Sequence, residues 1–135
     1  MTQAITNLPA LLRDMSPSLQ AEPYAFCTTT SARSLAIWPV AVGLFRESEG
    51  VTIILPTADA DAAGLAYDGA WACITLTVHS SLSAVGFLAA ISARLAEAGL
   101  SLNPVAGYYH DHLFVPWERR QDALTVLAAL RAGQG

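Results

Sequence analysis

Hydrophobic and polar residues alternate along residues 71–78, a pattern that predicts a β-strand with one buried face. The apolar face would hold every second residue from Ala72 to Val78. The opposite face would hold every second residue from Cys73 to His79. Shorter runs rich in β-branched and aromatic residues predict further strands. They cover residues 24–30, a hairpin with arms 42–46 and 51–55, and a second pair, 102–109 and 113–115.

Apolar residues at helical spacing predict four helices, over residues 7–15, 57–66, 82–98 and 117–131. Asn7 is placed to cap the first helix, and Ser80-Ser81 to cap the third. The third helix would turn a stripe formed by Val85, Leu88, Ile91 and Leu95 inward, and Gly99 would end it. Residues 31–39 show little pattern and are interpreted as a loop. The sequence His110-Asp111-His112 is expected to form the turn of the second hairpin.

In chain order the first half reads α–β–β–β–α and the second β–α–β–β–α. Strands mixed with helices and hairpins indicate an α+β protein with a largely antiparallel sheet. A right-handed β–α–β crossover leaves room for one strand between its parallel strands, and the later hairpin strand fills it. This is the ferredoxin-like arrangement, with helices on one face of the sheet. The other face, which includes Cys73, Thr75 and Thr77, would suit a partner chain.

Composition excludes several classes of protein. Of 135 residues only 13% are charged, the net charge is −4, and all seven cations are arginine. An acidic chain without a basic patch argues against nucleic acid or anionic lipid as a partner, and we expect no membrane span or secretion signal. The lack of lysine excludes Schiff-base, P-loop and kinase-type lysine chemistry. Cys27 and Cys73 have no metal-ligand spacing and are expected to be reduced thiols of a cytoplasmic protein.

The segment from Ser80 to Gly86 opens the third predicted helix. Free N–H groups and the positive end of the helix dipole make such a start suitable for a carboxylate, and Gly86 would allow close approach. The simpler interpretation is a serine N-cap with no ligand.

Polar rings and a carboxylate gather around the turn at residues 107–112. In the ferredoxin-like order, His79 would lie at the same end of the sheet as His110, Asp111 and His112. Three interpretations stay open: a hydrogen-bonded turn, a site for a small effector, or a metal site with histidine ligands. Catalytic motifs are missing, and although Ser80 or Ser81 with His110 and Asp111 resembles a triad on paper, adjacent His and Asp residues rarely orient as one.

Several motifs together resemble the ACT domain. They are the run from His79 to Phe87, the helix end at residues 95–100, the strand start at residues 103–107, and Val115-Pro116 followed by a helix containing Asp122-Ala-Leu. Further segments, at residues 17–27, 45–50 and 107–112, are similar to small bacterial proteins of two ACT-like halves, and to the ACT regions of aspartate kinases and cytosolic arginine sensors. The resemblance implies two βαββαβ halves, 1–70 (degenerate, with a leading helix) and 71–135, in one compact unit.

The resemblance also implies a function. ACT domains bind small effectors, commonly amino acids, and regulate rather than catalyse. We therefore expect a cytoplasmic, non-catalytic amino-acid-binding protein, a homodimer without a cofactor or a bound metal. The expected ligand-binding residues are Ser80, Ser81, Val85, Gly86, Asn103, His110, Asp111 and His112. Two alternatives remain: a metal-binding protein or metal-dependent enzyme using His79, His110, Asp111 and His112, and an oligomerisation module without a ligand.

Overall fold

A computed structural model describes residues 4–133, and the chain divides into two compact units. The inserted unit comprises Ala21–Trp71. The outer unit comprises the chain up to Gln20 together with the chain from Ala72 onward. Residues before Ala21, which the sequence assigns to the first half, thus pack with the second half. Leu11 and Met15, both fully buried, belong to the core of the outer unit.

The outer unit contains a four-stranded sheet. Its strands are β1 (Pro17–Leu19), β5 (Trp71–Leu76), β7 (Asp111–Pro116) and β6 (Asn103–Ala106), in the spatial order β1-β5-β7-β6. The β1/β5 and β6/β7 pairs are antiparallel, with Ser18 opposite Thr75 and Ala106 opposite Asp111. The fourth strand of this ferredoxin-like sheet is thus β1, which comes before the other three strands in the chain.

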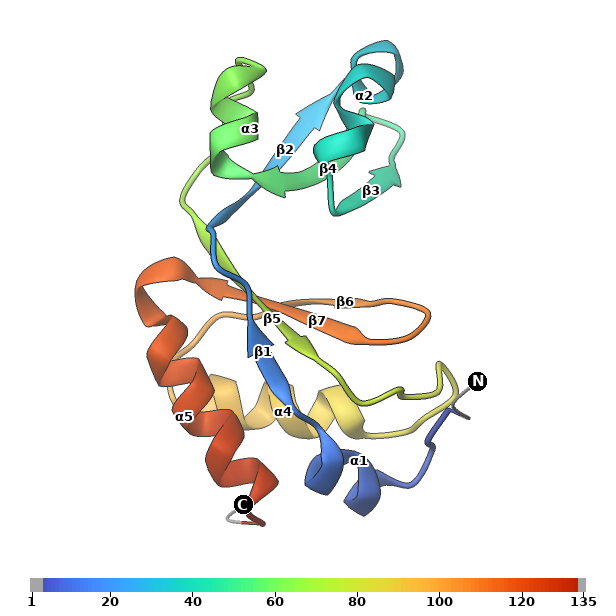
Figure 1. Cartoon of the computed structure of the whole chain (residues 1–135), viewed down its shortest axis with the longest axis vertical. Coiled ribbons are helices and arrows are strands. Elements are labelled where there is room, and N and C mark those ends of the chain that lie inside the picture. The colour runs from blue at the N-terminus through green and yellow to red at the C-terminus, as the bar shows by residue number, and fades with distance from the viewer. Residues whose placement is uncertain (1–3, 134–135) are drawn as a thin grey trace. The chain divides into compact units, whose positions relative to one another are not determined.

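Helices of the outer unit cover one face of this sheet, as Figure 1 shows. They are α1 (Leu8–Asp14), α4 (Phe87–Glu97) and α5 (Arg120–Arg131), the last preceded by the 3₁₀ turn Trp117–Arg119. The predicted alternation along β5 is confirmed: Ala72, Ile74 and Leu76 are fully buried against the helices. Asn7 caps α1 as predicted, accepting a hydrogen bond from the Ala10 N–H at 2.9 Å.

The inserted unit has the same order of elements, β–α–β–β–α. It consists of β2 (Tyr24–Thr29), α2 (Ser31–Ile37), a 3₁₀ turn (Trp38–Val40), β3 (Gly43–Arg46), β4 (Val51–Pro56) and α3 (Thr57–Ala62). The strands lie in the order β3-β4-β2, both pairs antiparallel. Ala25, Ile53, Leu55 and Ala60 form the centre of its core. Both units therefore confirm the predicted α+β, ferredoxin-like fold.

The predicted loop at residues 31–39 is wrong, because Ser31–Ile37 is helical. Thr30 caps this helix by accepting from the Arg33 N–H at 3.2 Å. The apolar residues of this segment do not mark an inward face: Leu35 is 79% exposed, and Trp38, which follows the helix, is 56% exposed.

The predicted start of the third helix is also wrong. Helix α4 begins at Phe87, five residues later than expected, because Gly86 has a φ of 90° and a left-handed residue cannot continue an α-helix. Ser80 is therefore not its N-cap. Val85, expected on the inward stripe, is 84% exposed.

The tip of the second hairpin lies earlier than predicted. Residues 107–110 form the turn, closed by the Gly107 N–H donating to the His110 carbonyl at 2.9 Å. Asp111 and His112 belong to strand β7. Their side chains therefore point to opposite faces of the sheet rather than gathering at a loop tip.

Within residues 4–133, no helix combines the length and the apolar character that crossing a membrane requires.

Candidate functional site

A pocket of about 160 Å³ lies in the outer unit, where the loop after β5, the start of α4 and the β6–β7 hairpin meet. Ser80, Ser81 and Gly86 of the loop line it, together with the first turn of α4, Ala106 of β6 and Asp111 of β7. The pocket is thus built from three chain segments and not from the loop alone.

One wall of the pocket is the N-terminus of α4. Gly86 is the N-cap and its carbonyl accepts from the Ala90 N–H at 2.9 Å, but no side chain caps the helix. The N–H groups of Phe87, Leu88 and Ala89 precede the first intrahelical donor, so they have no acceptor within the helix. The same three residues line the pocket. This wall therefore presents donors and the positive end of an 11-residue helix.

A buried carboxyl group lies on another wall. Asp111 is 5% exposed, and its Oδ2 accepts a hydrogen bond of 2.8 Å from the hydroxyl of Ser80, which is 7% exposed. Asp111 is held at the first residue of β7, opposite Ala106 of β6. The pocket thus combines hydrogen-bond donors at the helix start with an acceptor on the sheet.

The loop between β5 and α4 is held by its own hydrogen bonds. The Ser81 Oγ accepts from the Ser83 N–H at 3.0 Å, and the Ser81 carbonyl accepts from the Ala84 N–H at 3.0 Å. The Ser81 N–H donates to the Ile5 carbonyl at 2.8 Å. These bonds fix the turn whose residues line the pocket.

Four of the predicted ligand-binding residues line this one pocket: Ser80, Ser81, Gly86 and Asp111. Val85 lies in the same loop but is solvent-exposed and is not part of the lining. Asn103 is exposed at the far end of β6, opposite Phe114. The apolar lining at Leu82, Phe87 and Ala106 was not anticipated, because the sequence placed residues 82–86 inside a helix.

His110 and His112 do not face the pocket. The His110 Nδ1 lies 3.3 Å from the Val78 carbonyl oxygen. The His112 Nδ1 lies 3.0 Å from the Thr75 Oγ1 on the other face of the sheet, and the Gln20 amide donates to that same oxygen at 3.4 Å. Burial lowers the pKa of His112 from its ordinary value of 6.5; His110 lowers it further, and Asp111 opposes the shift. His112 is therefore a neutral structural link between strands at pH 7.

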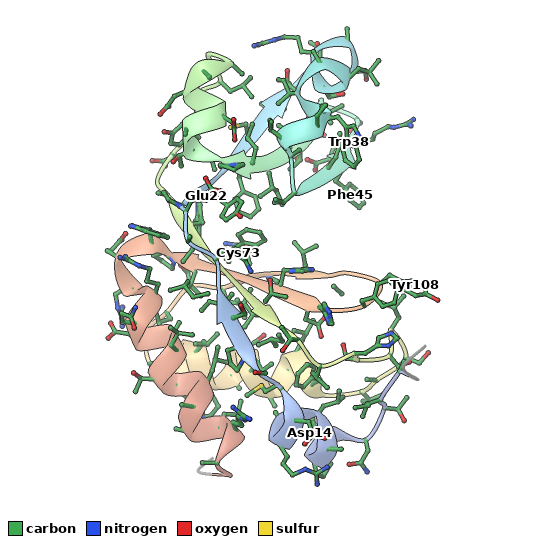
Figure 2. All side chains as sticks on the ribbon, viewed as in Figure 1. Asp14, Glu22, Trp38, Phe45, Cys73 and Tyr108 are labelled. Carbon is green, nitrogen blue, oxygen red and sulfur yellow. The ribbon has the colours of Figure 1, made fainter. Side chains whose placement is uncertain are left out.

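Aromatic rings cluster at the turn of the β6–β7 hairpin. The Tyr108 and Tyr109 ring centroids are 5.0 Å apart, and the His79 ring lies 5.2 Å from Tyr109. Tyr108, labelled in Figure 2, is 71% exposed. His79 therefore lies near the turn, as predicted, with its ring tilted against the ring of Tyr109.

The metal alternative gains no support from this geometry. Among residues 4–133, no group of three or more His, Cys, Asp or Glu side chains is arranged to hold a metal ion. A serine–histidine–aspartate triad is also not formed by the described contacts, because the Ser80 hydroxyl bonds Asp111 directly.

Comparisons with known proteins agree with the fold. Two family models of the ACT domain match the chain, over residues 3–72 and 70–129. A search of curated proteins found no match.

Solved structures give a similar picture. A Vibrio cholerae protein of unknown function, described as a possible transport protein, is 44% identical, with a TM-score of 0.81 over 92% of this chain and 95% of its own. A protein from Agrobacterium tumefaciens is 16% identical, with a TM-score of 0.71 over 87% and 89% of the two chains. The ligand-free regulatory subunit of aspartate kinase from Thermus thermophilus is 9% identical, with a TM-score of 0.58 over 87% and 98%. At these low identities the last two show likeness of fold alone.

Proposed function

The chain belongs to the ACT-domain family, and we propose that it is a non-catalytic regulatory protein that binds a free amino acid in the pocket at the start of α4. One observation carries this proposal: the pocket has opposite poles, with helix N–H groups that have no acceptor within the helix on one wall and the Asp111 carboxyl group on another. An α-amino acid has the matching pair of charges.

The carboxylate of the ligand would accept hydrogen bonds from the N–H groups of Phe87, Leu88 and Ala89. Helix N-termini favour anions because the donors are unpaired and the helix dipole is positive there. Gly86 has no side chain to shield these donors. Its backbone conformation, with φ at 90°, is one that glycine adopts without strain.

The ammonium group of the ligand would donate to Asp111. This carboxyl group is already aimed by the Ser80 hydroxyl, so little side-chain freedom is lost on binding. A charge-assisted hydrogen bond of this kind is about twice as strong as a neutral one.

The size of the pocket indicates a small ligand. Its volume of about 160 Å³ is close to that of cavities of about 150 Å³ that take up benzene. We therefore favour amino acids with short side chains.

Binding would regulate by joining segments rather than by chemistry. A zwitterion bridging the α4 start and Asp111 would tie the loop after β5 to strand β7, and a ligand that binds only this arrangement shifts the population towards it. The proposal includes the cytoplasm as the location and a homodimer as the working form.

A thermal-shift screen of the standard amino acids, with and without EDTA, tests the proposal. We expect one or a few short amino acids to raise the melting temperature equally in both conditions. A rise that EDTA abolishes would indicate the metal alternative. No rise with any amino acid would contradict the proposal and leave the oligomerisation module.

A further inference from the structure

A short segment, residues 5–8, runs beside the loop between β5 and α4; Figure 1 draws it in blue next to that loop. Ile5 forms a parallel β-bridge with Ser80. The Ile5 N–H donates to the His79 carbonyl, and the Ile5 carbonyl accepts from the Ser81 N–H, both at 2.8 Å. The peptide groups on either side of Ser80 are therefore both bonded to a single residue from outside the loop.

The bridge acts on the acceptor wall of the pocket. With both flanking peptide groups held, the direction of the Cα–Cβ bond of Ser80 is set, and so is the position from which its hydroxyl donates to Asp111 at 2.8 Å. Ile5 itself is not among the residues that line the pocket. It therefore orients the Asp111 carboxyl group through Ser80, without a place in the wall.

The other end of the segment lies against the donor wall. The Leu8 Cδ2, in the first residue of α1, lies 3.5 Å from a Cβ built on Gly86, the N-cap of α4. Leu8 and Ile5 also pack against the core cluster that contains Phe87, the first residue of α4. Residues 5–8 therefore contact the protein next to both poles of the pocket.

The segment is fixed at its α1 end and held by few contacts at Ile5. Asn7 caps α1, and Leu11 of that helix is fully buried in the core of the outer unit. Thr6 and Asn7 are exposed, and Ile5 is half-buried. A contact made by so few groups opens locally at a much lower free energy than the whole domain unfolds. The bridge can therefore open while α1 stays in place.

We propose that the Ile5–Ser80 bridge regulates the pocket by holding both poles in the arrangement that binds an amino acid. This inference rests on the proposed function, since it concerns the same site. Ile5 is a positioning residue, because it acts on the ligand through Ser80 and Asp111. Binding and the bridge are coupled in both directions: an amino acid that prefers the bridged arrangement stabilises the bridge by the same factor by which the bridge strengthens its binding.

Hydrogen exchange of the full chain without ligand tests the bridge. Proline has no N–H, so Ile5→Pro loses the bond to the His79 carbonyl. Amides of residues 79–90 should then exchange about tenfold faster, whereas those of α5 should not change. The control is Thr6→Pro, at an exposed position outside the bridge, which only restricts Ile5 to the extended conformation that a β-bridge requires. Equal exchange of residues 79–90 in the two variants would overturn the proposal.

Calorimetry with glycine, L-alanine and L-serine, one at a time, tests the effect on the pocket. Ile5→Pro should bind about tenfold more weakly than the wild type. Thr6→Pro and Ile5→Ala should bind within about twofold of it, because both keep the two backbone bonds of Ile5. Ile5→Ala also removes the packing of the Ile5 side chain, so it separates loss of the bridge from loss of core contacts.

The wild-type protein supplies an independent measurement. A saturating amino acid from this set should slow exchange at Ile5 and Ser81, whose N–H groups make the bridge. Unchanged exchange there, or equal affinities of Ile5→Pro and Thr6→Pro, would overturn the proposal and leave the proposed function intact. Failure of all three compounds to bind the wild type would instead contradict the proposed function, and the regulation that rests on it would fall with it.

Discussion

The hydroxyl of Ser80 donates a hydrogen bond of 2.8 Å to the Oδ2 of Asp111, a residue 31 positions later in the chain. Both side chains are buried, and both line the pocket at the start of α4. The bond joins the loop after β5 to the first residue of β7. It therefore connects the stability of the loop to the position of the carboxyl group that we propose as the ammonium acceptor.

Ser80→Ala should destabilise the protein without ligand. Removing the donor leaves a buried carboxyl group with one hydrogen bond fewer, and leaving a buried acceptor without its partner costs about 1–3 kcal/mol. Urea titration should show this fall in the free energy of unfolding. Ser83→Ala, at an exposed position of the same loop, is the control and should change stability by no more than about 0.5 kcal/mol. An equal fall in the free energy of unfolding of both variants would mean that the Ser80–Asp111 hydrogen bond makes no specific contribution to stability.

Gly86→Asp should abolish amino-acid binding. It places a carboxylate where the carboxylate of the ligand would rest, at the start of α4. It also forces a side chain into a left-handed conformation, which costs about 1–2 kcal/mol.

The control for this strain is Gly99→Asp. Gly99 follows the end of α4 with a φ of 75°, and no heavy atom lies within 4 Å of a Cβ built there. Both variants should lose stability, and only Gly86→Asp should lose binding by calorimetry. Unchanged binding in folded Gly86→Asp would place the ligand elsewhere.

The stability of the protein should fall as the pH drops below about 6.5, partly because of His112. Burial lowers the pKa of His112 in the folded state, so the unfolded state binds more protons between the two pKa values. The stability that neutral His112 contributes is fully present above the pKa of His112 in the unfolded state. It is lost as the pH falls through the pKa of His112 in the folded state. Melting temperatures from pH 8 to pH 5 should fall less steeply in His112→Gln. Parallel pH profiles of the two proteins would contradict this role.

The two cysteines should be reduced and slow to react. Cys27 and Cys73 are free and buried, and burial raises the pKa of both thiols, which leaves little reactive thiolate at pH 7. Thiol counting should find slow labelling in the native protein and two thiols per chain after unfolding without reductant. A count of zero would show a disulfide and would contradict the proposed cytoplasmic location.

The fold could be predicted because its strands and longer helices have strong periodic patterns. The alternation from Ala72 to Val78 and the stripe of α5 follow directly from burial on one face. Helix α2 could not be predicted in this way. It is one short helix whose Leu35 is exposed, so its apolar residues do not mark an inward face.

The lining of the candidate pocket could be predicted only in part. The sequence singles out Ser80, Ser81, Gly86 and Asp111, which line it, but places Asp111 in a turn between two histidines. A shift of the hairpin turn to residues 107–110 moves Asp111 into β7, where neighbouring side chains alternate between faces. His112 therefore bonds Thr75 on the other face. Such a shift depends on the pairing of β6 with β7, which local sequence patterns do not determine.

Titration calorimetry with the amino acid found by thermal shift, and with the same compound lacking its α-amino group, tests the central claim most directly. The account predicts that the wild-type protein binds the amino acid and that loss of the amino group weakens binding by about tenfold or more. Asp111→Asn should weaken binding of the amino acid by a similar factor, because it removes the same contact between the ammonium group and the Asp111 carboxyl group. It should leave the affinity for the deaminated compound nearly unchanged, because that compound does not make this contact. Undiminished binding of the amino acid by folded Asp111→Asn would contradict the account.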